Sequence, residues 1–128
     1  MGGTVRVVLV EDNQVFRETL ELLLGLRGDM DVVASVSGGA EAVEVCGRLR
    51  PDVVVVDYRM PGLNGAQTTS EVLSASPESR VVCLTASVSS AEMEELAAAG
   101  AVECVRKDED LERIVTAIHE AADRPEGV

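Results

Sequence analysis

Apolar runs alternate along this chain with segments in which apolar residues recur every three or four positions. A continuous apolar run is typical of a strand buried on both faces, and a recurrence of three to four residues is typical of an amphipathic helix. The apolar runs are Val5 to Val10, Met30 to Ser35, Val53 to Val56, Val81 to Leu84 and Ala101 to Val105. A helical segment follows each of them. The alternation therefore predicts a (βα)5 chain, folded as a parallel sheet with helices on both faces.

The helical segments are bounded by residues that begin or end helices. Asp12 or Asn13 is a candidate cap for the first helix, which Gly28 is expected to end. The predicted inner face of this helix consists of Val15, Phe16, Thr19, Leu20, Leu23, Leu24 and Leu26. The later helices are predicted to follow Gly39, to cover Gly65 to Ala75 and Ala91 to Ala99, and to begin at Leu111.

Length and composition predict a single globular domain. The 128 residues are enough for one sizeable core, which must be aliphatic because Phe16 and Tyr58 are the only aromatic residues of the sequence. No apolar run approaches the roughly 18 residues that span a bilayer. No basic segment followed by an apolar leader begins the sequence, so we expect a cytoplasmic protein without a membrane partner. Residues 123–128 are expected to form a tail or the start of a linker.

Charge and cysteine content narrow the range of functions. A formal net charge of −12 argues against direct nucleic-acid binding by this chain, although a basic domain fused to it could still bind DNA. Cys46, Cys83 and Cys104 have the spacing of neither a disulfide framework nor a zinc site, so buried, reduced thiols are expected. Arginine occurs ten times but lysine once, at Lys107. This bias suggests that position 107 needs a compact ammonium group.

Polar groups stand where four of the predicted strands end. They are Glu11 and Asp12 after the first run, Asp57 after the third, Thr85 after the fourth and Lys107 after the fifth. Each of them alone has a simpler explanation, such as a helix cap or a turn former. Parallel strands, however, bring their carboxyl ends to one edge of a sheet. These groups are therefore predicted to converge as a single site.

The predicted site has the chemistry needed to bind Mg²⁺ and a phosphoryl group. Asp12 and Asp57 can supply carboxylate ligands, and Glu11 can hold a metal-bound water. A cation would relieve the repulsion among the three acids and keep Asp57 ionised as a nucleophile. Lys107 supplies a second cation, and the Thr85 hydroxyl can donate a hydrogen bond to the phosphoryl group.

Short segments around these residues occur in a characteristic order. They are Val8 to Asn13, Asp57 to Gly65, Leu84 to Ala86 and Val105 to Asp108. In this order they resemble the receiver domain of two-component response regulators, and the resemblance covers about residues 4–122. The helix start at Phe16-Arg17-Glu18 and the Lys107-Asp108 ending resemble the NarL/FixJ-like branch, whose members carry a C-terminal helix-turn-helix.

The resemblance implies a doubly wound, flavodoxin-like three-layer α/β sandwich with strand order 2-1-3-4-5. It implies that Asp57 accepts phosphate from a sensor histidine kinase, so that the protein is a switch and not a turnover enzyme. The implied Mg²⁺ ligands are Glu11, Asp12, Asp57 and the backbone carbonyl of Arg59. Thr85 and Lys107 would grip the phosphoryl group. The expected output is transcription, and the last strand and last helix are a candidate surface for a homodimer formed on phosphorylation.

One position departs from the family pattern. Three residues before the strand-ending lysine the family usually has Tyr or Phe, which turns inward when the switch threonine moves, whereas this chain has Cys104. Cysteine has no ring that could turn inward, so the Thr85–Cys104 switch pair is expected to respond differently from the threonine–aromatic pair of the family. We predict that phosphorylation occurs but that the response at the fourth helix and fifth strand is muted.

Three other functions are compatible with parts of this pattern. A phosphatase of the haloacid dehalogenase type also places Asp at a strand end but needs a second acid two residues later, where this chain has Arg59. A flavin-binding domain of the same topology would need a hydroxyl-rich phosphate loop after the first strand, where acids stand instead. A receiver-like module that only binds a partner, without phosphorylation, is the remaining alternative.

Overall fold

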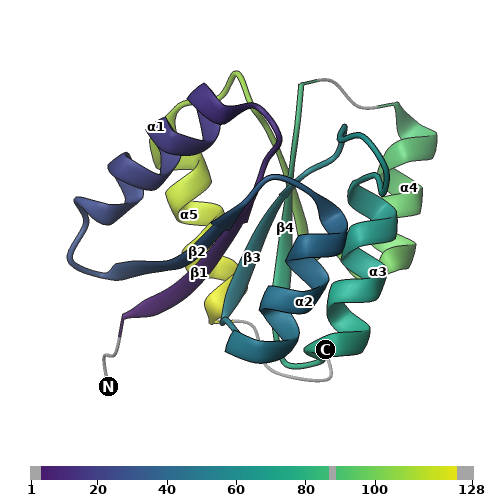
Figure 1. Ribbon diagram of the computed structural model, residues 1–128. Helices are drawn as coiled ribbons and strands as arrows, with labels where there is room; N and C mark the ends of the chain where they lie inside the picture. The colour runs from purple at the N-terminus through teal and green to yellow at the C-terminus, as the bar shows by residue number, and fades with distance from the viewer. Residues whose placement is uncertain (1–3, 87–88, 124–128) are drawn as a thin grey trace.

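The computed structural model describes residues 4–86 and 89–123 and confirms the predicted alternation of strands and helices (Figure 1). The strands are β1 (Val5–Val10), β2 (Met30–Val36), β3 (Val53–Asp57), β4 (Arg80–Thr85) and β5 (Glu103–Arg106). The helices are α1 (Gln14–Gly25), α2 (Gly39–Leu49), α3 (Gly65–Ala75), α4 (Ser90–Ala99) and α5 (Leu111–Ala122).

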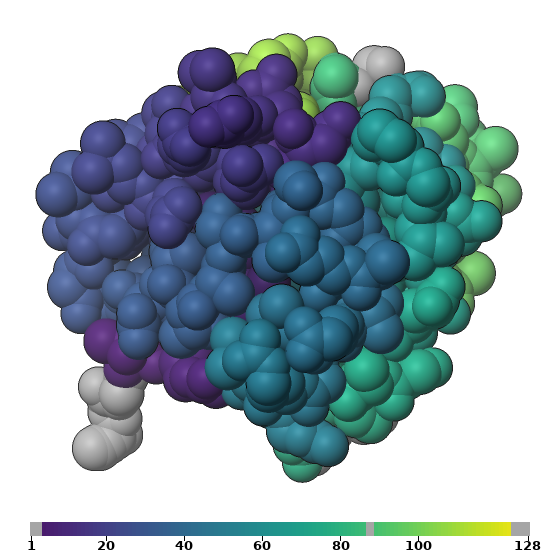
Figure 2. Space-filling model, in the orientation of Figure 1, coloured from purple at the N-terminus to yellow at the C-terminus, as the bar shows by residue number. Residues whose placement is uncertain are grey.

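The strands form one parallel sheet in the order β2-β1-β3-β4-β5. Helices α1 and α5 cover one face of the sheet, and α2, α3 and α4 cover the other (Figure 1). In the space-filling view the purple and blue N-terminal half fills the left of the molecule, and the teal and green α3 and α4 fill the right (Figure 2). This arrangement is the predicted flavodoxin-like sandwich.

The central strand β3 is buried on both of its faces. Val53 and Val55 pack in the cluster that contains α1 and α5, whereas Val54 and Val56 pack in the cluster that contains α2 and α3. None of the four is more than 2% exposed. Because successive strand residues point to opposite faces, an unbroken valine run fills both helical layers at once. The packing of these valines fixes Asp57 at the carboxyl edge of the sheet.

Side-chain caps set where the helices beside this edge begin. The Asn13 side chain accepts a hydrogen bond from the Phe16 backbone N–H at 2.9 Å, so Asn13, and not Asp12, caps α1. Asn64 and Gln67 form a reciprocal capping box at the start of α3. The carboxylate of Asp12 is consequently left to face the edge of the sheet.

Two details of α1 differ from the prediction. The helix ends at Gly25 rather than Gly28, and Val15 and Leu26 of the predicted inner face are 76% and 74% exposed. Thr19 and Leu23 of that predicted face are exposed as well. Val15 lies nine positions before the buried Leu24. That separation is about 2.5 turns at 3.6 residues per turn, so the two side chains are on opposite sides of the helix. Leu26 is the C-terminal cap, beyond the part of the helix that packs on the sheet.

The last strand and the C-terminus complete the comparison with the prediction. β5 begins at Glu103 rather than Ala101, because the Ala101 N–H still donates to the Leu96 carbonyl at the end of α4. The predicted tail, residues 123–128, lies outside the described residues apart from Asp123. No helix in the described part of the chain is long and apolar enough to cross a bilayer.

Candidate functional site

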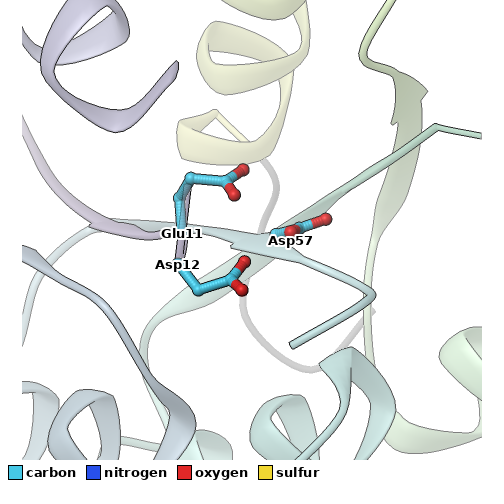
Figure 3. A group of neighbouring side chains, drawn as sticks. All are labelled: Glu11, Asp12 and Asp57. Carbon is cyan, nitrogen blue, oxygen red and sulfur yellow. The ribbon is translucent and has the colours of Figure 1, made fainter. Parts of the chain in front are cut away.

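Three carboxylates meet at the carboxyl edge of the sheet, as predicted. Glu11 and Asp12 directly follow β1, and Asp57 is the last residue of the neighbouring strand β3. One carboxylate oxygen from each residue lies within 4.8 Å of the others, and the Glu11 and Asp12 side chains extend side by side toward the strand end that carries Asp57 (Figure 3). Glu11 and Asp57 are buried, whereas Asp12 is exposed. The pocket is therefore open to solvent on the Asp12 side.

Glu11 is held in place by groups from two other elements. It is 3% exposed, and its Oε1 lies 2.7 Å from the Nζ of Lys107. Its Oε2 accepts a hydrogen bond from the Asn13 backbone N–H at 3.0 Å, and its carbonyl accepts one from the Arg17 guanidinium at 2.7 Å. These contacts fix the carboxylate against Lys107, a pairing that the sequence did not indicate.

Lys107 directly follows β5, the strand at one edge of the sheet, and its side chain extends toward the acids. Its backbone N–H donates to the Thr85 carbonyl at 2.8 Å, and its Nζ lies 3.4 Å from Asp57 Oδ2. The ammonium also sits 4.6 Å from the centre of the Phe16 ring. Burial alone would lower the pKa of Lys107, but the hydrogen bond and charge of Glu11, with the charge of Asp57, outweigh burial and raise it. Lys107 is thus a permanent cation beside the acids.

The carboxyl group of Asp57 is destabilised in its ionised form. It is 5% exposed, and burial, followed by repulsion from Glu11, raises its pKa to about 6 despite the opposing charge of Lys107. Three carboxylates face a single ammonium, so the pocket has an excess of negative charge. A small divalent cation with a preference for oxygen ligands fits this donor set.

Of the remaining predicted residues, Thr85 and the Arg59 backbone lie beside the same pocket, whereas Cys104 does not. Thr85 is the fully buried last residue of β4, and its neighbour Leu84 is the register partner of Asp57. The Arg59 backbone N–H lies 3.4 Å from Asp57 Oδ1, at the long end of hydrogen bonding. Cys104 lies on β5 and is partly exposed. The structure thus brings Glu11, Asp12, Asp57, Thr85 and Lys107 to one edge and places Cys104 farther down the sheet.

Two contacts from the loop after Asp57 were not predicted from the sequence. Tyr58 is buried, as its predicted packing role requires, and its hydroxyl donates to Glu95 Oε1 on α4 at 2.8 Å. The hydrogen bond to Glu95, together with burial, raises the pKa of Tyr58 to about 12, so the hydroxyl remains a donor. The Arg59 guanidinium donates to Glu92 Oε2 at 3.1 Å. The loop that follows Asp57 is therefore tied to α4.

The start of α3 approaches this loop so closely that only glycine fits. A Cβ on Gly65 would lie 2.6 Å from the Tyr58 Cα and 3.2 Å from the Asp57 carbonyl oxygen. The Gly65 N–H also donates to the Tyr58 carbonyl at 2.7 Å. This contact sets the path of the chain directly after Asp57.

Gly65→Ala is expected to lower the free energy of unfolding by about 1 to 3 kcal/mol, because the added methyl overpacks against backbone. Urea unfolding followed by circular dichroism would measure the change. Gly47→Ala in the last turn of α2 is the control, since its Cβ would meet the Ala75 Cβ at an ordinary 3.5 Å. Helix propensity should make that control neutral or more stable. Equal stabilities for the two variants would show that the contact at Gly65 is unimportant.

The sequence matches the response regulator receiver domain family over residues 7–119. It is 36% identical to the transcriptional regulatory protein LnrK of Bacillus subtilis, over 89% of this chain and 52% of that protein. It is also 36% identical to the transcriptional regulatory protein NarL of Mycobacterium tuberculosis, over 92% of this chain and 55% of that protein. The chain spans about half the length of these curated relatives.

Solved structures agree with the sequence comparison. The receiver domain of NarL from Mycobacterium tuberculosis superposes with a TM-score of 0.89 at 35% identity, over 95% of this chain and 98% of that one. A LuxR-family regulator from Aurantimonas superposes with a TM-score of 0.88 at 30% identity, over 94% of this chain and 86% of that one. The fold and its acidic pocket define a phosphoacceptor switch rather than a classical enzyme. The chain belongs to the response regulator receiver domain family, and its similarity to NarL and LuxR regulators confirms the predicted branch.

Proposed function

We propose that Asp57 accepts a phosphoryl group from the phosphohistidine of a sensor histidine kinase and that the new group shifts the domain to an active conformation. The observation that supports this proposal is the position of Asp57. Its carboxylate ends a fully buried strand, lies 3.4 Å from the only lysine of the sequence and shares a pocket with two further acids. This combination pairs a fixed oxygen nucleophile with a lysine ammonium and with acids that can hold a second cation.

In the proposed transfer an Asp57 oxygen forms a bond to phosphorus as the phosphorus–nitrogen bond of the phosphohistidine breaks. The histidine nitrogen keeps the electron pair of that bond. Lys107 holds a phosphoryl oxygen, and the Thr85 hydroxyl donates a hydrogen bond to another. Burial of Glu11 and its bond to the Asn13 N–H keep Lys107 aimed at the reacting group.

The residues proposed to hold Mg²⁺ are Glu11, Asp12, Asp57 and the backbone carbonyl of Arg59. When bound there, the metal would supply positive charge that offsets the acids and the phosphoryl oxygens. The fit rests on three carboxylates within 4.8 Å of one another and on the raised pKa of Asp57 without a metal.

The proposed output is transcription, as the names of the relatives LnrK and NarL state for those proteins. We propose residues 4–122 as the receiver domain and the residues after 122 as the start of a connection to an output segment. The net charge of −12 supports the proposal that another domain, and not this one, contacts DNA.

Intact-mass analysis after incubation with acetyl phosphate tests the proposed acceptor. The domain is expected to gain about 80 Da, the mass of one phosphoryl group, only when Mg²⁺ is present. Asp57→Asn should abolish the gain, whereas Asp31→Asn, at an exposed position on β2, should leave it unchanged. A gain that persists in Asp57→Asn would refute the assignment. No gain in the wild-type chain would favour a module that only binds a partner.

A further inference from the structure

Two cysteines face each other across β4 and β5. Cys83 and Cys104 are direct register partners on these parallel strands and pack in one cluster with Tyr58, Ala66 and Leu96. The neighbouring Cys83 thiol lowers the pKa of Cys104. The Cys104 thiol, together with burial, raises the pKa of Cys83. The structure therefore places two free thiols side by side on one face of the sheet.

The positions of the two residues suit a disulfide. Neighbouring strands lie about 4.8 Å apart, and disulfide-bonded residues have Cα atoms about 4.4 to 6.8 Å apart. Register partners on parallel strands also point to the same face of the sheet, as the shared cluster confirms. The expected separation falls within that range, and a disulfide with a partly exposed sulfur is readily reduced. The pair is thus suited to reversible oxidation rather than to permanent cross-linking.

The two thiols differ in their access to solvent. Cys104 is partly exposed and lines a hollow of about 250 Å³ between α4 and β5, beside Met93, Leu96 and Val102. Cys83 is 0% exposed and lies behind it. A small oxidant can therefore reach Cys104 first, and the thiol that can then react with it belongs to its register partner on the next strand.

We propose that Cys83 and Cys104 form a redox pair that a peroxide oxidises to a disulfide. The Cys104 sulfur attacks one peroxide oxygen, the oxygen–oxygen bond breaks, and Cys104 sulfenic acid and water form. The Cys83 sulfur then attacks the sulfenic sulfur, its proton is lost, and the hydroxyl leaves as water. Two thiols and one hydrogen peroxide thus yield one disulfide and two waters.

The disulfide would join the strands close to the phosphoryl site. Cys83 stands two residues before Thr85 on β4, and Cys104 stands three residues before Lys107. Cys104 also occupies the place where the family usually has an aromatic switch residue. No atom of Asp57 takes part in this chemistry, so it can be tested separately from phosphorylation.

The test is to treat the reduced domain with hydrogen peroxide, unfold it in denaturant and alkylate the remaining thiols. The wild-type chain is expected to lose two hydrogens and to go from three alkylated cysteines to one, which is Cys46. Cleavage after glutamate separates Cys83 from Cys104, because Glu92, Glu94 and Glu95 lie between them. The linked pair should then appear as two peptides joined by a reducible bond.

Single variants identify the partners. In Cys104→Ser, Cys83 and Cys46 should both stay alkylated after peroxide, whereas Cys46→Ser should lose both remaining thiols. Cys46 is a suitable control because it is buried on α2 and its burial raises its pKa to about 11. Asp57→Asn should behave as the wild-type chain does. Full alkylation after peroxide, overoxidised Cys104 with free Cys83, or a bond between two chains would each overturn the proposal.

Discussion

Lys107→Met is expected to slow phosphorylation by acetyl phosphate by a factor of about 100, the usual loss when one charge-stabilising donor is removed from a site. Methionine keeps the unbranched shape but removes the ammonium that lies 3.4 Å from Asp57 Oδ2. The charge that develops on the phosphoryl oxygens then loses its protein cation. The rate of mass gain with acetyl phosphate and saturating Mg²⁺ measures the effect.

The same change is expected to lower the free energy of unfolding at neutral pH by about 1 to 3 kcal/mol, the cost of leaving a buried acceptor without its partner. Glu11 is 3% exposed and would lose the ammonium 2.7 Å away. Arg48→Met is the matched control, since its ion pair with Glu44 is 62% and 66% exposed on the two sides. An exposed pair of this kind contributes about 0.3 to 0.5 kcal/mol.

The two readouts separate two roles of Lys107. A slower transfer with unchanged stability would mean that Glu11 is satisfied without the lysine. Lower stability with an unchanged transfer rate would remove Lys107 from the proposed phosphoryl site. Both losses together are the expected result.

Asp57→Asn is expected to raise the free energy of unfolding by about 1 to 3 kcal/mol at pH 7.5 in the absence of Mg²⁺. The pKa of Asp57 is raised from 3.8 to about 6, and each unit corresponds to about 1.4 kcal/mol. The ionised carboxylate is thus less favourable in the folded chain than in the unfolded one. Asparagine fills the same space without the charge, so it removes the repulsion with Glu11.

The sign of the pH dependence follows from this shift. Between pH 3.8 and about 6 the folded chain binds the Asp57 proton more tightly than the unfolded chain does. The destabilisation is therefore complete above pH 6 and disappears as the pH falls toward 4. The stability difference between variant and wild type should shrink across that range and should also shrink when Mg²⁺ is added at pH 7.5.

Urea unfolding of both proteins at several pH values measures this difference. Asp31→Asn, an exposed carboxylate on β2, is the control and should leave stability within about 0.5 kcal/mol of the wild type. An Asp57→Asn variant that is less stable than the wild type at pH 7.5 would contradict the expectation. So would a gain that does not change with pH.

The valine run and the polar strand ends were sufficient to predict the central part of the structure. The run Val53 to Val56 predicted a strand buried on both faces. In a parallel sheet the residues that follow the strands all lie at one edge. The convergence of Glu11, Asp12 and Asp57 followed from that topology. The order of the strands came from the family resemblance, because alternation alone does not say which strands are neighbours.

Contacts between side chains distant in sequence could not be predicted. The Tyr58–Glu95 and Arg59–Glu92 bonds join residues 37 and 33 positions apart, and acids on a helix surface are usually solvated. The predicted inner face of α1 included Val15 and Leu26, which are apolar but exposed. In each case the missing information was the placement of a helix on the sheet, which packing of the whole chain decides.

The Tyr58–Glu95 and Arg59–Glu92 hydrogen bonds connect the β3–α3 loop to α4 at a distance from the end at which the helix is fixed. At its C-terminal end the helix is anchored, since Gly100 and Ala101 donate to carbonyls of its last turn and Val102 donates to β4. Glu92 and Glu95 lie one turn apart on one side of the helix, before that anchored end, and the loop after Asp57 holds both. A shift of that loop would therefore act on α4 at a point away from its anchored end, which favours a tilt of the helix over a slide along its axis.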